Sequence, residues 1–237
     1  MQRKAEQLTI AGVLLIVLAL STASPTRAQD NKSPYPSMAP LAQYFMADRN
    51  AEIALARTAA PKSISADATV MILGSHGYQT AVQGNNGFVC VVERAWMSPF
   101  DHPEFWNPRN RSPICYNPAA ARSILPYTFK RTEFVLAGLS KPEMLDRIKA
   151  AVARKELPTP EPGAMSYMLS KEQYLNDSVG RWFPHLMFHI PKTDGASWGA
   201  NLDGSPVLYD PRELPEPETI FFVPVGMWSD GTPAPPM

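Results

Sequence analysis

The chain has 237 residues, 22 basic and 22 acidic side chains, 25 prolines and only two cysteines. This neutral balance argues against nucleic acid as a partner, because phosphate binding requires a concentrated basic face. It also gives no support to a polybasic membrane-binding patch.

The N-terminus has the layout of a secretory signal peptide. A basic pair precedes a thirteen-residue apolar run over 8–20, and a small, polar stretch follows. A transmembrane helix needs about twenty apolar residues, so this run is short for one. We predict a leader at 1–28 that is cleaved after Ala28, with Ala23 as the alternative site and an uncleaved anchor as a second alternative. The mature chain would then carry a net charge of −2, lack a membrane span and reside in the periplasm or outside the cell.

The mature chain is predicted to be a single α+β domain over 39–228. A flexible linker at 29–38 would precede it, and a disordered tail at 229–237 would follow. Proline-rich polar stretches also occur at 156–163 and 210–218, and their composition argues against regular structure there.

The first predicted helix spans 39–59 and ends before Pro61. Asp48 and Glu52 lie one turn apart at the border of its apolar arc. Paired carboxylates can perform acid–base chemistry or bind a metal ion. At such a border, however, we expect them to be surface charges that meet arginines.

Two apolar strands are predicted next, at 68–73 and 87–94. The Asn-Asn-Gly stretch at 85–87 is typical of a tight turn, because Asn and Gly tolerate positive φ. It predicts a β-hairpin that pairs 78–83 with 87–94. Because 88–92 is apolar on both faces, this strand should be covered on both sides and lie beside 68–73.

The two cysteines are predicted to form a disulfide bond, Cys90 to Cys115. Exported chains fold in an oxidising compartment, where two cysteines make one probable bridge. A reactive thiol is the alternative, but no basic residue adjoins Cys90 on its own face and burial would raise its pKa. The bridge would tie the proline-rich aromatic loop 96–116 to the central strand.

The second half of the chain predicts two further helices and four strands. Asn117 and Pro118 are typical of a helix start, and Pro126 would end that helix. Ser140 and Glu143 form the capping box of the next helix. Strands are expected at 132–137, 164–169, 185–190 and 219–225. Helices and strands do not alternate strictly, so we predict an α+β fold with a mainly antiparallel sheet, about three helices and one disulfide.

The histidines offer the first chemical possibility. His185 and His189 have zinc-ligand spacing if helical, but on a strand they lie about 13 Å apart and cannot share an ion. We therefore predict no metal site and no cofactor, and expect the two side chains to find hydrogen-bond partners on one face of the sheet. A site that joins one of them to His76 or His102 and a carboxylate is the alternative.

Another possibility is the G-x-S-x-G pattern at 195–199. No helix is expected after it and no histidine lies beyond His189, so we predict a glycine-rich turn rather than a nucleophile elbow.

The densest chemistry lies in the loop after the second apolar strand. It combines two acids, an imidazole and aromatic rings, a set that could bind a ligand or transfer a proton. A loop held by a disulfide is a plausible place for function, although such aromatics can also simply pack the loop down. The residues concerned are Trp96, Asp101, His102, Glu104 and Trp106.

Several short motifs occur in a recognisable order: GNNGFVC at 84–90, a second cysteine, GAMSYML at 163–169 and FFVPVG at 221–226. In this order the chain resembles a group of uncharacterised exported bacterial proteins. The resemblance implies export and a disulfide, and it implies no activity.

The functional prediction is a non-enzymatic binding module. It would bind a small molecule or an envelope protein through the loop 96–116 and the face that carries His185 and His189. The alternative is a metal-assisted or acid–base hydrolase that uses His102 or His76 with nearby carboxylates.

Overall fold

The strands form where β-branched and aromatic residues concentrate, and they assemble into one eight-stranded sheet. The computed structural model describes residues 33–212 and 214–235, so the predicted leader at 1–28 lies outside the described residues. Residues 33 onward belong to one unit. None of the helices in its described part is long and apolar enough to cross a membrane.

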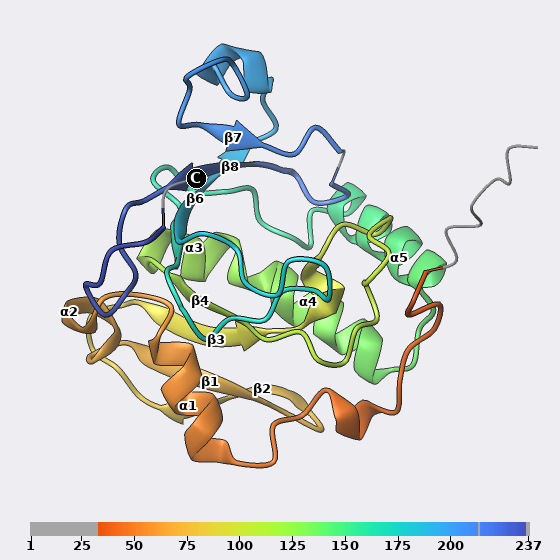
Figure 1. Ribbon diagram of the computed structural model, residues 1–237. Helices are drawn as coiled ribbons and strands as arrows, with labels where there is room; N and C mark the ends of the chain where they lie inside the picture. Colours follow the sequence, from red (N-terminus) through yellow and green to blue (C-terminus); the bar gives the residue numbers. More distant parts are fainter. Residues whose placement is uncertain (1–32, 213, 236–237) are drawn as a thin grey trace, which may run out of the picture. The chain divides into compact units, whose positions relative to one another are not determined.

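The sheet has the strand order β2-β1-β3-β4-β5-β6-β8-β7 (Figure 1). All neighbours are antiparallel except β1 and β3, which are parallel. The mainly antiparallel α+β prediction is therefore confirmed, as are the three late strands. The strands are β1 (Thr69–Gly74), β2 (Gly77–Val82), β3 (Val89–Glu93), β4 (Ser112–Tyr116), β5 (Met165–Met168), β6 (His185–Pro191), β7 (Leu208–Tyr209) and β8 (Glu218–Pro224).

The predicted hairpin of 78–83 with 87–94 is wrong. β2 pairs instead with β1 across a two-residue turn at 75–76, where Gly74 faces Gly77 and Gly77 has a φ of 97°. The Asn-Asn-Gly stretch belongs to a crossover that places β3 on the other side of β1. Its backbone and side chains bond to the preceding loop, with Asn86 Nδ2 donating to the Ile64 carbonyl at 2.8 Å.

This crossover passes directly over the start of β1. A Cβ atom at Gly84 would lie 2.2 Å from the backbone nitrogen of Thr69, so only glycine fits. Gly87 has the positive φ of 78° that such a motif favours, but local propensity carries no information about which strand will pair with the next one.

Five α-helices occur in the described residues, against about three predicted. α1 packs on one face of the sheet, and α3 and α4 pack on the other, with α5 beside α4 (Figure 1). The helices are α1 (Arg49–Arg57), α2 (Lys62–Ser65), α3 (Pro118–Ser123), α4 (Leu125–Leu136) and α5 (Lys141–Ala153), and the 3-10 turns are η1 (Leu41–Gln43), η2 (Ala95–Met97) and η3 (Gly195–Trp198).

The first helix is shorter than the predicted 39–59. Asp48 has extended backbone angles and caps α1, accepting from the backbone N–H groups of Asn50 at 2.8 Å and Ala51 at 3.2 Å. Glu52 is not a surface charge, since it is buried and forms an ion pair with Arg94 at 2.8 Å. Neither carboxylate is available for the chemistry of a paired acid.

The strand predicted at 132–137 is wrong, because these residues belong to α4. The helix predicted to start at Asn117 and Pro118 does end before Pro126, at Ser123, but Pro126 then stands in the first turn of α4, where its missing N–H costs nothing. Thr128, Thr132 and Val135 are buried at helical spacing, and tertiary packing outweighs the strand propensity of the β-branched residues.

Two local predictions are confirmed. α5 begins with the predicted capping box of Ser140 and Glu143. The disulfide joins Cys90 to Cys115, which face each other directly on β3 and β4 and are fully buried beneath α1. The two cysteines therefore link adjacent strands at the centre of the sheet.

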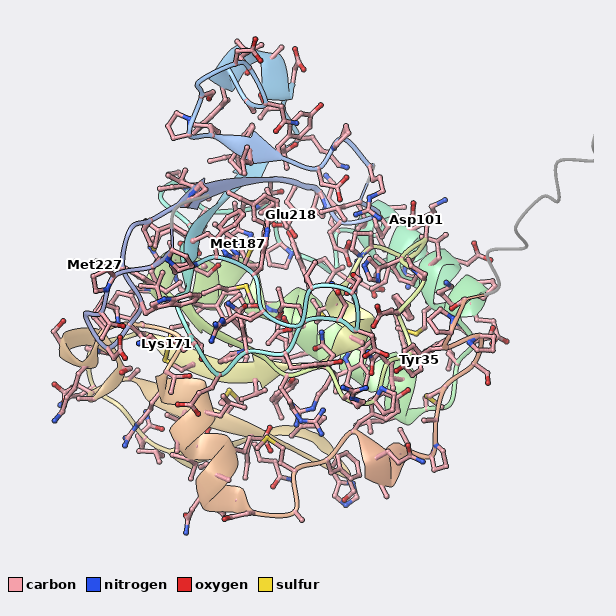
Figure 2. All side chains as sticks on the ribbon, in the orientation of Figure 1. Tyr35, Asp101, Lys171, Met187, Glu218 and Met227 are labelled. Atoms are coloured by element: carbon pink, nitrogen blue, oxygen red, sulfur yellow. A yellow bond between two sulfur atoms is a disulfide. The ribbon has the colours of Figure 1, made fainter. Side chains whose placement is uncertain are left out.

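Both ends of the described unit contact its body. The Tyr35 hydroxyl donates to the Asp177 carboxylate at 2.6 Å. Near the C-terminus, the Ser229 N–H donates to the Leu169 carbonyl at 2.9 Å. Figure 2 shows Met227 at the left margin of the unit, where its side chain is 58% exposed, whereas Met187 and Glu218 are buried.

Candidate functional site

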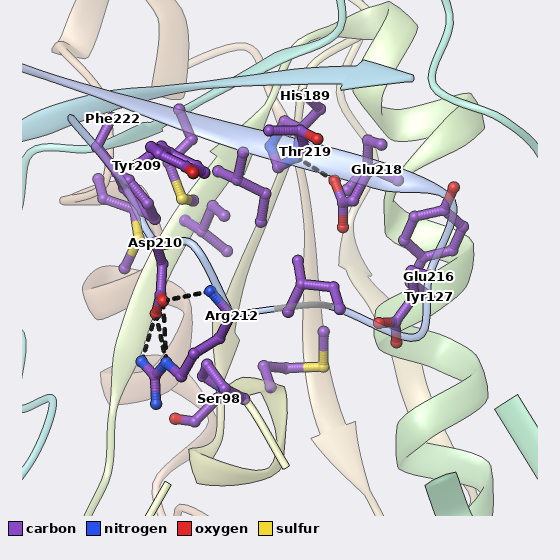
Figure 3. Close-up of a pocket in the computed structure, with 18 of the residues that line it drawn as sticks. Ser98, Tyr127, His189, Tyr209, Asp210, Arg212, Glu216, Glu218, Thr219 and Phe222 are labelled. Carbon is purple, nitrogen blue, oxygen red and sulfur yellow. Dashed lines mark hydrogen bonds and ion pairs between the residues drawn. The ribbon is translucent and has the colours of Figure 1, made fainter. Parts of the chain in front are cut away.

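A cavity of about 880 Å³ lies between α4 and the sheet face opposite α1. Its floor comes from alternate residues of β3, β4, β6 and β8, because the strand registers place these side chains on one face. Its walls come from the loops at 97–102 and 208–216 (Figure 3). The volume falls within the range of about 300–1,000 Å³ typical of small-molecule sites.

Glu93 brings a carboxyl group to the cavity floor. Val89, Val91 and Glu93 share one face of β3, so the acid follows two apolar residues toward the cavity. Its Oε1 accepts hydrogen bonds from the Thr128 hydroxyl at 2.7 Å and from the Tyr116 hydroxyl. Burial raises the pKa of Glu93, which favours its neutral form. Its Oε2 has no hydrogen-bond partner among residues 33–212 and 214–235.

His189 is held between two buried partners. Its Nδ1 lies 2.8 Å from Glu218 Oε2, and its Nε2 lies 3.0 Å from Ser166 Oγ. His189 and Glu218 point toward one another at one end of the cavity (Figure 3). Ser166 is fully buried on β5 and does not line the cavity, so it orients the imidazole instead of offering a nucleophile.

His185 also reaches the cavity. Its Nδ1 donates to the Phe183 carbonyl at 2.9 Å, and its ring packs against Trp182 and Phe222. Burial lowers the pKa of His185 to about 4, so the imidazole is neutral near pH 7. With the proton on Nδ1, Nε2 carries a lone pair, and no residue of the described chain hydrogen-bonds to it.

Two arginines connect the cavity walls. Arg131 of α4 makes a bidentate pair with Glu216, at 2.7 and 2.8 Å, and both side chains are 2% exposed. The same guanidinium donates to the carbonyls of Trp96 and Ser98, so it joins three parts of the wall. Nearer the surface, Arg212 pairs with Asp210 beside it (Figure 3) and donates to Asp101 in the opposite loop at 3.1 Å.

Of the five candidate residues predicted in the loop 96–116, only one lines the cavity. His102 lines the cavity and is half-buried. Asp101 is exposed and serves the ion pair with Arg212. The other three are structural: Glu104 accepts from the Asp177 backbone N–H, the carbonyl of Trp106 accepts from a tyrosine hydroxyl, and Trp96 is fully buried in the core.

Of the four histidines, three line the cavity and one does not. His102, His185 and His189 line one cavity, which sequence separation alone could not show. His76 is exposed at the turn between β1 and β2 and lines a different cavity of about 390 Å³. The predicted strand geometry at His185 and His189 is confirmed, and both rings have hydrogen-bond partners.

In the part of the chain that the structure describes, no three His, Cys, Asp or Glu side chains are grouped as metal ligands.

The G-x-S-x-G stretch forms the 3-10 turn η3, and Gly199 at its end has a φ of 62°. Ser197 Oγ donates to the Asp194 carbonyl at 2.6 Å. This geometry confirms a turn and differs from a strand-to-helix elbow.

The sequence did not single out the acids of the floor and wall. Glu93 could have been noticed as the charged residue that ends an apolar alternation. Glu216 and Glu218 lie in the proline-rich stretch 210–218, and the expectation of an unstructured segment there is wrong at its C-terminal end. Glu216 is buried against Arg131, and Glu218 begins β8.

Known proteins add nothing to this picture. No family model matches the sequence, and comparisons with curated proteins and with solved structures give no match. The fold and the cavity therefore have to be interpreted from their own geometry.

Proposed function

We propose that this protein binds a small, largely apolar molecule in the cavity between α4 and the sheet. The observation that carries the proposal is a cavity of about 880 Å³ whose floor presents Glu93 Oε2 and His185 Nε2, two polar atoms without hydrogen-bond partners among the described residues. Apolar walls with a few placed polar groups are the usual composition of a ligand site. The apolar lining includes Met97, Ile114, Ile124, Met168, Met187, Leu208, Ile220 and Phe222.

A concave, buried site favours a small molecule over an envelope protein as the partner. Protein interfaces are usually broad and formed on the surface, whereas here the polar groups lie at the base of a cavity. The histidine face predicted from the sequence supports this proposal, since His185 and His189 both line the cavity. Of the predicted loop residues, His102 supports it too.

We further infer that the protein works in the periplasm or outside the cell. Support comes from the leader-like sequence at 1–28 and from the disulfide, which oxidising compartments maintain. The sequence resemblance to exported proteins agrees with this inference. N-terminal sequencing of protein from fractionated cells should find Gln29 as the first residue, and an intact leader in a cytoplasmic fraction would contradict export.

Binding can be tested with Nile red, a neutral dye whose fluorescence rises in apolar surroundings. We expect saturable binding at one site to the folded wild-type protein. Ile220→Trp places a large ring in the cavity and should abolish this binding. Met227→Trp is the matched control, because Met227 is 58% exposed and does not line the cavity. Equal binding by both variants would refute the cavity as the site.

An acid–base hydrolase is the second candidate, favoured by the hydrogen-bonded chain in which Glu218 orients the imidazole of His189, since both residues line the cavity. A carboxylate that orients an imidazole is a common arrangement for proton transfer. Hydrolysis of nitrophenyl esters that depends on this chain should be lost in Glu218→Gln while Nile red binding persists. If the wild-type protein has no such activity, the binding function alone remains.

A further inference from the structure

We propose that the cavity selects an uncharged ligand with a carbonyl oxygen, and that the Glu93 carboxyl group donates a hydrogen bond to that oxygen. This inference rests on the proposed binding function and names the chemical class of the ligand. Its basis is the unequal surroundings of the two oxygens of Glu93, a side chain that is 7% exposed and lines the cavity.

One oxygen of Glu93 is fully occupied. Oε1 accepts from both the Thr128 and the Tyr116 hydroxyl groups, and those hydroxyls are themselves 3.1 Å apart. Two donors occupy the lone pairs of Oε1, so the proton of the neutral acid has to be carried by Oε2. The proton then resides on Oε2, for which no acceptor exists within residues 33–212 and 214–235.

In the described part of the chain, Glu93 has no cationic side chain in direct contact with it. No described residue forms an ion pair with it, because the nearby cationic side chains have other partners. Arg131 is paired with Glu216, and Arg94 is paired with Glu52. A buried carboxylate without a counter-ion is costly, so the neutral acid is the stable form at the floor.

The titratable groups around Glu93 come from four elements. Tyr116 on β4 contacts it directly, and Tyr78 on β2, His189 on β6 and Arg131 on α4 interact with it electrostatically. Of these, only Arg131 carries a permanent charge, and Glu216 balances it. Burial is the larger effect on the pKa of Glu93 and raises it, whereas His189 and Arg131 lower it, so the neutral acid is favoured and suits a neutral acceptor on the ligand.

Apart from the exposed charged residues Lys192, Asp194 and Arg212, the rest of the lining fits an uncharged ligand. His185 is neutral and offers Nε2 as an acceptor, so a hydroxyl or N–H group on the ligand could bind there. Between these polar points the floor is formed by apolar residues such as Ile114, Met168 and Met187. A charged ligand would lose its hydration in this environment without a matching ion.

The test compares acetylnaphthalene, ethylnaphthalene and naphthylmethylammonium as competitors of Nile red. Glu93→Met removes the donor, and Glu93→Gln keeps it, because the amide can accept through oxygen and donate through nitrogen. The affinity ratio of the ketone to the hydrocarbon should fall about tenfold in E93M, the worth of one hydrogen bond, and stay near the wild-type ratio in E93Q. Thermal unfolding of both variants verifies that they fold.

A second readout does not depend on E93M folding. Wild-type affinity for acetylnaphthalene should decrease as rising pH ionises Glu93, whereas the affinity of E93Q should stay constant. Three outcomes would each overturn the inference while leaving cavity binding intact. The first is an unchanged ketone-to-hydrocarbon affinity ratio in E93M, and the second is a wild-type affinity for acetylnaphthalene that does not depend on pH. The third is tighter binding of the ammonium compound that is lost in E93Q. If no naphthalene and no Nile red binds to the wild type, the proposed function fails and this inference fails with it.

Discussion

Replacement of Arg131 by methionine should destabilise the protein and open the cavity wall. The guanidinium makes two hydrogen bonds to Glu216 and two to the carbonyls of Trp96 and Ser98, all from a side chain that is 2% exposed. Methionine preserves much of the side-chain volume but none of these donors. The substitution therefore leaves the Glu216 carboxylate buried without a cation.

The expected cost follows from that stranded charge. Removal of one partner from a buried ion pair costs about 3–5 kcal/mol. Ser98 lines the cavity, where water can replace the donor that its carbonyl loses, so we add little for the two carbonyls and expect about 4 kcal/mol. At roughly 2–4 °C per kcal/mol for a unit of this size, Tm should fall by about 8–16 °C. Nile red binding should weaken with it.

Urea unfolding at neutral pH provides the assay. Arg131→Met/Glu216→Met removes the stranded carboxylate and should recover more than half of the loss. Arg122→Met is the matched control, because Arg122 also makes a bidentate pair, with Glu161, but its side chain is 62% exposed. It should cost less than about 1 kcal/mol. Equal losses for R131M and R122M, or strict additivity in the double variant, would refute the reasoning.

Two further predictions concern the disulfide and the buried imidazole. Cys90→Ala/Cys115→Ala should lower the unfolding free energy by about 3.5 kcal/mol in the chain-entropy model for a separation of 25 residues. In the unreduced wild-type protein alkylation should label neither sulfur, and two labelled thiols would contradict the bond. Burial lowers the pKa of His185 from an ordinary value of about 6.5 to about 4. On acidification the unfolded state therefore binds a proton before the folded state does. About 3 kcal/mol of the free energy of unfolding should be lost as the pH falls between these two values. Urea titrations should show a shallower loss in His185→Gln, and identical pH slopes for variant and wild type would count against a buried neutral imidazole.

Local features were predicted well because they depend on residues that are close in the chain. Ser140 and Glu143 make a capping box within a single helical turn. His185 and His189 share a face because a strand alternates its side chains every two residues. The bond between Cys90 and Cys115 was predicted from a count of two cysteines and a predicted leader, without knowledge of the strand registers.

The same local logic failed where packing competed with it. Thr132 and Val135 favour a strand, yet they lie in α4, where their burial against the core outweighs propensity. Asp48 and Glu52 looked alike as helix-border charges. One caps a helix and the other is buried against Arg94, and only the position of β3 distinguishes them.

The cavity depends on contacts between distant parts of the chain. Glu93, Glu216 and Glu218 meet at it because β3 and β8 belong to one sheet and α4 covers the same face. Chain periodicity can state which face of a strand a residue occupies, but it carries no information about which strand or helix lies next to that face. The disulfide and the local elements can therefore be predicted from the order of residues, whereas the cavity exists only once long-range packing has brought its acids and imidazoles together.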